Sequence, residues 1–218
     1  MEDKININFE VNKKEAMSLI KTLDTVYFFD KTKILEKIQK DLLNFVNADT
    51  ILNGQIKLED KIIVADPCFL NFDIYSNHIV SLDIVPGMYN CYINPYSLTR
   101  PKNVIVLLEA EDYTEDGFES IMKSIAVESG QGGIFNYSFY KQMYSLRFGE
   151  EVFREEYFKI SNTTYIDNNY QKQIVDDKYF VTSTAYGDGA YQVFVKKNKD
   201  GKIIGIKIDY EKDMSDYE

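Results

Sequence analysis

Three acidic residues stand within two positions of a glycine or proline at the ends of apolar runs, where carboxylates can do chemistry. They are Asp66 in VADP, Glu128 in VESGQGG and Asp188 in TAYGDGAYQVF. Because glycine lets a ligand approach the backbone closely, such carboxylates can hold a metal ion or act as general acid and base. Each could instead accept backbone N–H bonds in a turn where glycine supplies left-handed dihedrals. We favour this structural interpretation for each residue taken alone.

A nucleophile–base pair has few candidates in this chain. His78 is its only histidine, so a serine–histidine–acid triad or a cysteine–histidine pair would have to use it. Its place in YSNHIV, at the entry to a strand, favours a surface loop position instead. Ser129 and Ser183 offer hydroxyls near the acidic residues. The SGQGG bend lacks the sequence of a phosphate-binding loop, so we expect no bound nucleotide.

The GDG segment is the predicted binding segment. Tyr186 and Tyr191 flank Gly187, Asp188 and Gly189, and exposed tyrosines are common in protein interfaces. With YFVTST before it and AYQVFVK after it, the segment is also the expected connection between two strands of an antiparallel meander. In that case the glycines set the turn, and Asp188 anchors it by accepting bonds from backbone N–H groups.

Charge restricts the partners that this chain can bind. Its 218 residues carry a formal net charge of −10, which argues against binding nucleic acid, since that needs clustered Lys and Arg. The acidity fits a basic protein partner, mimicry of a polyanion, or simple solubility. No C-x-x-C metal-ligand spacing is present, and we expect neither a metal nor a cofactor.

The first ten residues and the surroundings of the two cysteines indicate the cellular compartment. MEDKININFE lacks the basic start and apolar core of a signal peptide, and no run approaches the roughly 18 apolar residues that cross a bilayer. We therefore expect a cytoplasmic protein with no membrane contact. Cys68 and Cys91 lie in apolar contexts, where a free cysteine behaves as a small buried hydrophobe. A disulfide between them is the alternative.

Periodicity predicts an α+β fold: a largely antiparallel sheet domain with an N-terminal helical segment and one or two inserted helices. The helical segment is residues 1–53, where apolar side chains recur three and four apart. A turn at Asn53-Gly54 opens the main domain, residues 54–210, and residues 211–218 form an acidic tail. We expect the helical segment to pack on the main domain.

The main domain reads as short strands separated by turn residues. The expected strands lie in KIIVADP, HIVSLDIV, MYNCYIN, NVIVLLEAE, two pieces of IAVESGQGGIFNYSFY, YFVTST, AYQVFVK and KIIGIKIDY. NVIVLLEAE is the most continuous apolar run, which predicts a central strand. NKDG predicts a hairpin. Thr114 is the expected N-cap of a short helix in TEDGFESIMKS, and KQMYSLRFGEEVFREEYFKI is expected to be helical with an interruption at Gly149.

Four motifs follow one another between about Lys61 and Tyr210: VADP, IVPGMYNCYI, VESGQGGIF, and GDGAYQVFV with DGKIIGIKIDY. Their order resembles a bacterial family of uncharacterised proteins, domain-of-unknown-function family 4241. The residues that fall on the family pattern are Asp66, Gly87, Tyr89, Gly130, Gly132, Gly187, Asp188, Gly189 and Tyr191. The chain departs from it at Glu128, where the family has Asp, and near Tyr137, where an Asp often follows. The resemblance implies no established activity, and its one functional hint is that some members belong to toxin-immunity neighbourhoods.

Two functions from different classes compete. We expect a non-enzymatic protein-binding module of the immunity or inhibitor type, whose acidic surface meets a basic partner. The alternative is a hydrolase or metal-assisted enzyme in which Asp66, Glu128 and Asp188 converge in one cleft. A polyanion mimic that blocks a nucleic-acid-binding protein is a third possibility, and it requires a continuous acidic stripe.

Overall fold

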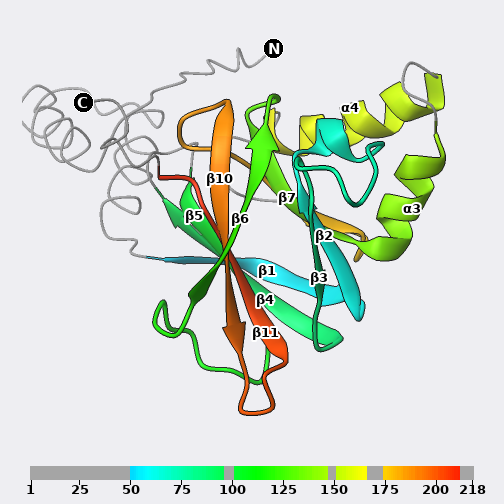
Figure 1. The fold of residues 1–218 in the computed structure, drawn as a ribbon. Helices are drawn as coiled ribbons and strands as arrows, with labels where there is room; N and C mark the ends of the chain where they lie inside the picture. The colour runs from blue at the N-terminus through cyan, green and yellow to red at the C-terminus, as the bar shows by residue number, and fades with distance from the viewer. Residues whose placement is uncertain (1–49, 96–100, 147–150, 166–173, 212–218) are drawn as a thin grey trace, which may run out of the picture.

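Two antiparallel sheets form the body of the protein (Figure 1). The computed structural model describes residues 50–95, 101–146, 151–165 and 174–211. The six-stranded sheet has the order β1-β4-β5-β11-β10-β6, and the five-stranded sheet has the order β3-β2-β7-β9-β8. The α+β prediction is thus confirmed at the level of antiparallel sheet plus helices, but the strands divide between two sheets. The expected helical segment lies outside the described residues, apart from its last few positions.

The strands of each sheet are given in spatial order. The six-stranded sheet comprises β1 (Ile51–Leu58), β4 (Gly87–Pro95), β5 (Pro101–Leu108), β11 (Ile203–Asp209), β10 (Gly189–Lys197) and β6 (Glu119–Val127). The five-stranded sheet comprises β3 (Val80–Asp83), β2 (Lys61–Ala65), β7 (Gln131–Asn136), β9 (Tyr179–Ser183) and β8 (Ile174–Val175). The remaining elements are the 3₁₀ helix η1 (Pro67–Phe69) and the helices α3 (Tyr137–Ser145) and α4 (Glu151–Tyr165).

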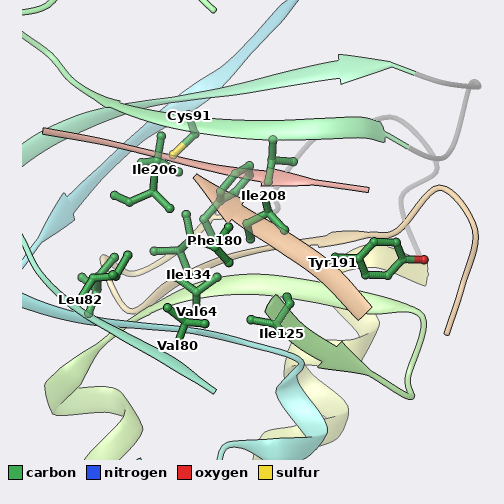
Figure 2. Packing of buried hydrophobic residues seen from close by; sticks show 14 of the residues in the cluster. Val64, Val80, Leu82, Cys91, Ile125, Ile134, Phe180, Tyr191, Ile206 and Ile208 are labelled. Carbon is green, nitrogen blue, oxygen red and sulfur yellow. The ribbon is translucent and has the colours of Figure 1, made fainter. Parts of the chain in front are cut away.

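The main core lies between the two sheets. Side chains of β7 and β9, such as Ile134 and Phe180, pack there against Ile206 and Ile208 of β11 (Figure 2). Alternation in β11 produces this face, because side chains two apart on a strand point to the same side. Burial of each such side chain stabilises the fold by about 1.5–3 kcal/mol.

A second core lies on the opposite face of the five-stranded sheet, under α3 and α4 (Figure 1). Phe139 and Met143 of α3 and Phe153 of α4 pack there with Phe135 of β7. All of β7 is therefore buried, since both of its faces are covered. This double coverage explains why Gly133 is needed: a Cβ there would lie 2.6 Å from Val181 Cγ2 and 2.9 Å from the carbonyl oxygen of Phe180.

Most of the expected strands are confirmed. NVIVLLEAE contributes β5, which lies inside its sheet between β4 and β11, and NKDG closes the β10–β11 hairpin. The expected interrupted helix corresponds to α3 and α4. The second piece of IAVESGQGGIFNYSFY ends earlier than expected, because α3 begins at Tyr137.

The helix predicted in TEDGFESIMKS is wrong. Thr114 Oγ1 accepts a hydrogen bond from the N–H of Asp116 in a turn, Gly117 has φ +81°, and the chain then enters β6 at Glu119. Pairing with β10 along the whole of β6 outweighs the apolar spacing that suggested a helix.

Two predicted turns are also wrong. Asn53-Gly54 lies inside β1, where a register shift against β4 and a φ of +145° at Gly54 mark a bulge. The domain boundary at 53 therefore falls within a strand. The GDG segment does not join neighbouring strands of a meander, because β9 belongs to the five-stranded sheet and β10 to the six-stranded sheet. It is a crossover between the sheets.

Candidate functional site

Asp66 lies at the centre of the sequence motifs. It follows β2 directly, caps η1, and is completely buried at 0% exposure. Its carboxylate accepts hydrogen bonds from the N–H groups of Cys68 (2.8 Å), Glu128 (2.8 Å) and Ser129 (2.7 Å). It also accepts one from the hydroxyl of Ser129 (2.7 Å). A buried carboxylate needs such donors, because burial without them costs several kcal/mol.

The other two motif segments meet beside this carboxylate: residues 128–132 contact Asp66, and residues 184–189 contact residues 128–132. The N–H of Thr184 donates to the carbonyl oxygen of Gly130 (2.9 Å), and a Cβ on Gly130 would lie 3.9 Å from the Cα of Gly187. Gly189 pairs with Val127 at the end of the β6–β10 ladder. We call this region the motif pole, defined as Asp66, residues 128–132 and residues 184–189. The fold therefore brings together motif segments that are far apart in the sequence.

The side chains at the motif pole differ from those expected of an active centre. Glu128 and Asp188 are exposed, and Glu128 bonds to Asp66 through its backbone N–H. Tyr186 is 39% exposed, whereas Tyr191 is only 1% exposed. The hydroxyl of Tyr191 donates to the carbonyl oxygen of Gly187 (2.8 Å). Among the described residues, no three His, Cys, Asp or Glu side chains are grouped so that they could hold a metal ion.

Tyr210 and Thr182 lie against the motif pole, and the site prediction included neither of them, nor Thr184 within it. The Tyr210 hydroxyl lies 3.0 Å from Thr182 Oγ1, and a Cβ on Gly132 would lie 2.7 Å from the same hydroxyl. Burial raises the pKa of Tyr210 above its usual range. The alternation of β11, which places Tyr210 on the buried face with Ile206 and Ile208, was the available signal.

Cys68 has the surroundings of an inert thiol. Burial, together with the charge of Asp66 and a hydrogen bond to it, raises the pKa of the Cys68 thiol far above its usual range. The thiol therefore keeps its proton, and the thiolate is the nucleophilic form. Cys68 and Cys91 are both free, so the disulfide alternative is wrong.

His78 is packed between aromatic rings. Its imidazole stacks on Phe69 with 4.5 Å between ring centroids and meets Phe72 edge-on at 5.4 Å. The residue is half-buried, so the expected surface loop position is corrected to a packing position. Offset and edge-on ring arrangements of this kind stabilise a loop by about 0.5–1.5 kcal/mol.

A second polar region, the connection between β5 and β6, stands out by charge. Six of the eleven residues from Glu109 to Glu119 are acidic and none is basic. Five of these six are exposed, and Glu111 is half-buried. We call Glu109–Glu119 the acidic connection. The run EAEDYTEDGFE is visible in the sequence as a group of like charges, but the sequence-based prediction names only residues 211–218 as an acidic segment.

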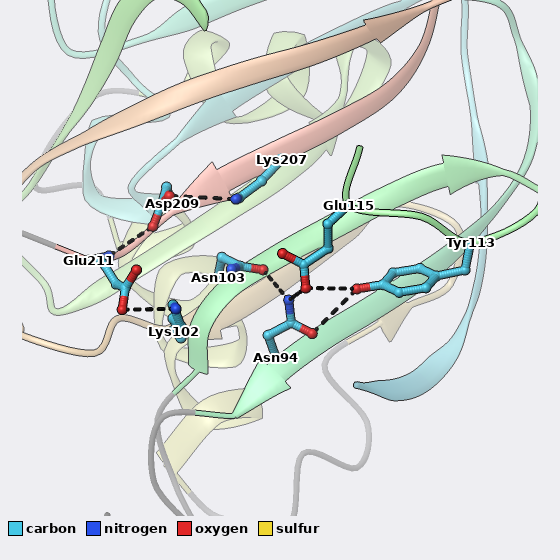
Figure 3. A network of polar contacts seen from close by, with 8 residues as sticks. All are labelled: Asn94, Lys102, Asn103, Tyr113, Glu115, Lys207, Asp209 and Glu211. Atoms are coloured by element: carbon cyan, nitrogen blue, oxygen red, sulfur yellow. Dashed lines mark hydrogen bonds and ion pairs between the residues drawn. The ribbon is translucent and has the colours of Figure 1, made fainter. Parts of the chain in front are cut away.

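The acidic connection is fixed to the sheet by neutral polar groups. Asn94 donates through its Nδ2 to Glu115 Oε1 (2.7 Å) and to Asn103 Oδ1 (2.8 Å) (Figure 3). The hydroxyl of Tyr113 donates to Glu115 Oε1 (3.3 Å), and the Tyr113 ring packs 4.5 Å from that of Tyr92. None of these contacts neutralises a carboxylate, so the connection is held in place while it keeps its charge.

Burial raises the pKa of the Tyr113 hydroxyl, and the charge of Glu115 raises it further. The hydroxyl therefore stays protonated beside the carboxylate and can donate to it. At the start of the connection, Gln55 Nε2 donates to Glu109 Oε1 (2.8 Å). Two ion pairs lie at the start of β5 and the end of β11. They join Lys102 to Glu211 (3.0 Å) and Lys207 to Asp209 (3.6 Å) (Figure 3).

The described helices include none that is long and apolar enough to span a membrane. In comparisons with known proteins, no protein-family model, no curated protein and no solved structure matches the chain. The arrangement of its own residues must therefore carry the functional argument.

Proposed function

We propose that the protein is a non-enzymatic binding module of the immunity or inhibitor type, and that its acidic connection receives a basic protein partner. The observation that carries this proposal is the combination of high charge with fixed position in Glu109–Glu119. A fixed group of like charges attracts a basic surface over a distance and orients it on arrival.

The anchoring of the connection supports a role in binding. A flexible acidic loop would lose conformational entropy when a partner bound, at a cost of roughly 1–2 kcal/mol for each residue fixed. Here the contacts of Asn94 and Tyr113 hold Glu115 before any partner arrives. A preformed surface of this kind avoids that cost.

The alternative, a hydrolase or metal-assisted enzyme at the motif pole, has weaker support. Its central residue, Asp66, is buried and already accepts four hydrogen bonds from the chain. A carboxylate with its lone pairs engaged in this way is a poor general base. The proposed resemblance to family 4241 is compatible with either function, since it carries no activity.

The test neutralises the acidic connection without touching its anchors. Glu111→Gln, Asp112→Asn, Asp116→Asn and Glu119→Gln are combined, because among the described residues no side-chain hydrogen bond or ion pair depends on these four groups. Wild type and variant are immobilised, and proteins from the source cell are captured at low salt. We expect a basic protein that wild type captures and the variant loses by about tenfold or more.

A matched variant controls for total charge. Asp83→Asn, Glu151→Gln, Glu155→Gln and Asp200→Asn remove the same number of negative charges from other surfaces, all at exposed positions. This control variant should capture the partner as well as wild type does. Equal loss from both variants would show that only the net charge matters, and capture that survives neutralisation of the acidic connection would overturn the proposal.

A further inference from the structure

A groove of about 550 Å³ lies between the two sheets on the side where β3 and β6 are the edge strands. Its walls include Lys61 of β2, Ser81 of β3, and Lys123 and Ser124 of β6. The loop before β3 adds Ser76 and Asn77. This volume is in the range that holds a small organic ligand, about 300–1,000 Å³.

The groove is basic although the protein is acidic. Lys61 and Lys123 come from different sheets and line the same space. Neither forms an ion pair with a carboxylate of the described residues. The ammonium of Lys61 lies 4.8 Å from the centre of the Tyr137 ring, which positions the charge without neutralising it. Two cations that have no ion-pair partner among the described residues thus line one space in a chain of net charge −10.

The wall of the groove also holds an unused hydrogen-bonding group. The hydroxyl oxygen of Ser76 is buried and has no hydrogen-bond partner among the described residues. A buried hydroxyl without a partner costs about 1–3 kcal/mol, so it is uncommon in a stable fold. Rotation of the Ser76 side chain would let this hydroxyl donate to an acceptor atom in the groove that Ser76 lines.

Two large apolar side chains stand at the groove in unusual positions. Tyr75 and Met122 are 92% and 91% exposed. Met122 has φ +55° at the point where β6 shifts register against β10, and its N–H donates to the hydroxyl of Ser120 (3.1 Å). A left-handed backbone at a residue other than glycine is strained, and such strain is concentrated at functional sites. The bulge thus places Met122 among the residues that line the groove.

We propose that this groove binds a small organic anion, one that carries a phosphate or carboxylate beside a flat apolar group. Lys61 and Lys123 attract the anionic group, and the hydroxyl of Ser76 donates to one of its oxygens. Tyr75 and Met122 cover the apolar part. Such a site lies outside the acidic connection, so it can exist whether or not a basic protein binds there.

The test uses simple probes and the full chain. Phenyl phosphate, benzoate, inorganic phosphate and phenol are titrated separately while backbone amide shifts are recorded by nuclear magnetic resonance. We expect phenyl phosphate or benzoate to shift the amides of Ser76, Ser81, Lys123 and Ser124, and to bind about tenfold more tightly than inorganic phosphate or phenol. Whichever of the two organic anions binds more tightly identifies the anionic group.

Variants decide whether the lysines are responsible. Lys123 is exposed on an edge strand, so the Lys123→Gln variant should fold normally. It should bind the organic anion about tenfold more weakly than wild type does. Lys61→Gln should do the same. The matched controls Lys57→Gln and Lys199→Gln, on exposed positions away from the groove, should leave it unchanged. No shift at the groove amides, or equal affinity in the Lys123 and control variants, would overturn the proposal.

Discussion

At the motif pole a single buried carboxylate, that of Asp66, accepts hydrogen bonds from three N–H groups and a hydroxyl. In the acidic connection most of the six carboxylates between Glu109 and Glu119 face water, and a few neutral side chains hold the segment from below. The same chemical group therefore performs two tasks. Buried and saturated with donors, it fixes the backbone of its own turn and of the distant segment at Glu128 and Ser129. Exposed and without an ion-pair partner among the described residues, it is available to a partner protein.

This difference shows why residue type alone misleads about function. Asp66, Glu128 and Asp188 resemble one another in sequence, each within two residues of a glycine or proline. Only Asp66 is buried, and its burial with four donors assigns it to the stability of the fold. The following changes separate the structural carboxylate from the exposed ones.

The largest effect is expected at Asp66. Asp66→Ala leaves three N–H groups and one hydroxyl at the motif pole without their acceptor, and we expect a loss of about 4 kcal/mol in the free energy of unfolding. Asp66→Asn, which keeps the volume, should also destabilise, since its amide places donors against donors. Urea unfolding measures both. Asp188→Asn is the control and should change the free energy by less than about 0.5 kcal/mol. A loss below 1 kcal/mol for Asp66→Ala would mean that the carboxylate is not needed for stability.

Gly133 tests the close packing behind the motif pole. Gly133→Ala places a methyl group 2.6 Å from Val181 Cγ2 and 2.9 Å from the carbonyl oxygen of Phe180. Relief of the second contact would require the backbone of β9 to shift, which would strain its pairing with β7. We expect a loss of about 2–3 kcal/mol in the same urea experiment. Gly201→Ser, at an exposed turn with nothing near its Cβ but a φ of +75°, provides a comparison in which only backbone strain acts. It should cost about 1 kcal/mol.

Alkaline pH tests the burial of the tyrosines that surround the second core. Burial, reinforced by Glu156 and Asp176, raises the pKa of Tyr179 from its usual 10 to about 12. The folded protein holds this proton more tightly than the unfolded chain does. The stabilising contribution is therefore complete below about pH 10 and is lost as the pH rises through 12, by about 1.4 kcal/mol for each pH unit between them. Unfolding in urea at pH 8, 10 and 11 should show a shallower decline for Tyr179→Phe than for wild type. Parallel declines would show that Tyr179 ionises equally in both states.

The smallest effect on stability is expected from the acidic connection. Combined replacement of Glu111, Asp112, Asp116 and Glu119 by their amides should leave the free energy of unfolding within about 0.5 kcal/mol of wild type, or raise it slightly by relieving repulsion. Urea unfolding at low and high salt measures this. A loss of more than 2 kcal/mol would show that these charges, like that of Asp66, hold the fold together.

Local patterns predicted much of the fold, and long-range pairing accounts for what they missed. The strand at NVIVLLEAE and the hairpin at NKDG depend on periods and turn residues that a short window contains. The division into two sheets depends on which strands pair, and period-two alternation is the same for either sheet. Phe118, Ile121 and Met122 have helical spacing, yet β10 pairs with this segment as a strand.

The candidate site likewise depends on contacts between residues that are far apart in the sequence. The glycines and Asp66 could be recognised as unusual from sequence, but the donors to Asp66 at Glu128 and Ser129 lie 62 and 63 residues away. No local pattern encodes such a contact. The acidic connection was legible as a run of like charges, whereas its anchoring by Asn94 depends on the neighbouring strands β4 and β5.

The rate at which the captured basic partner associates with the protein tests the central claim most directly. We predict that the association rate constant of wild type falls about tenfold between low salt and physiological salt. The variant neutralised at Glu111, Asp112, Asp116 and Glu119 should associate slowly at both salt concentrations, while the variant neutralised elsewhere behaves as wild type does. Equal association rates for wild type and the variant of the acidic connection would contradict the claim that these carboxylates receive the partner.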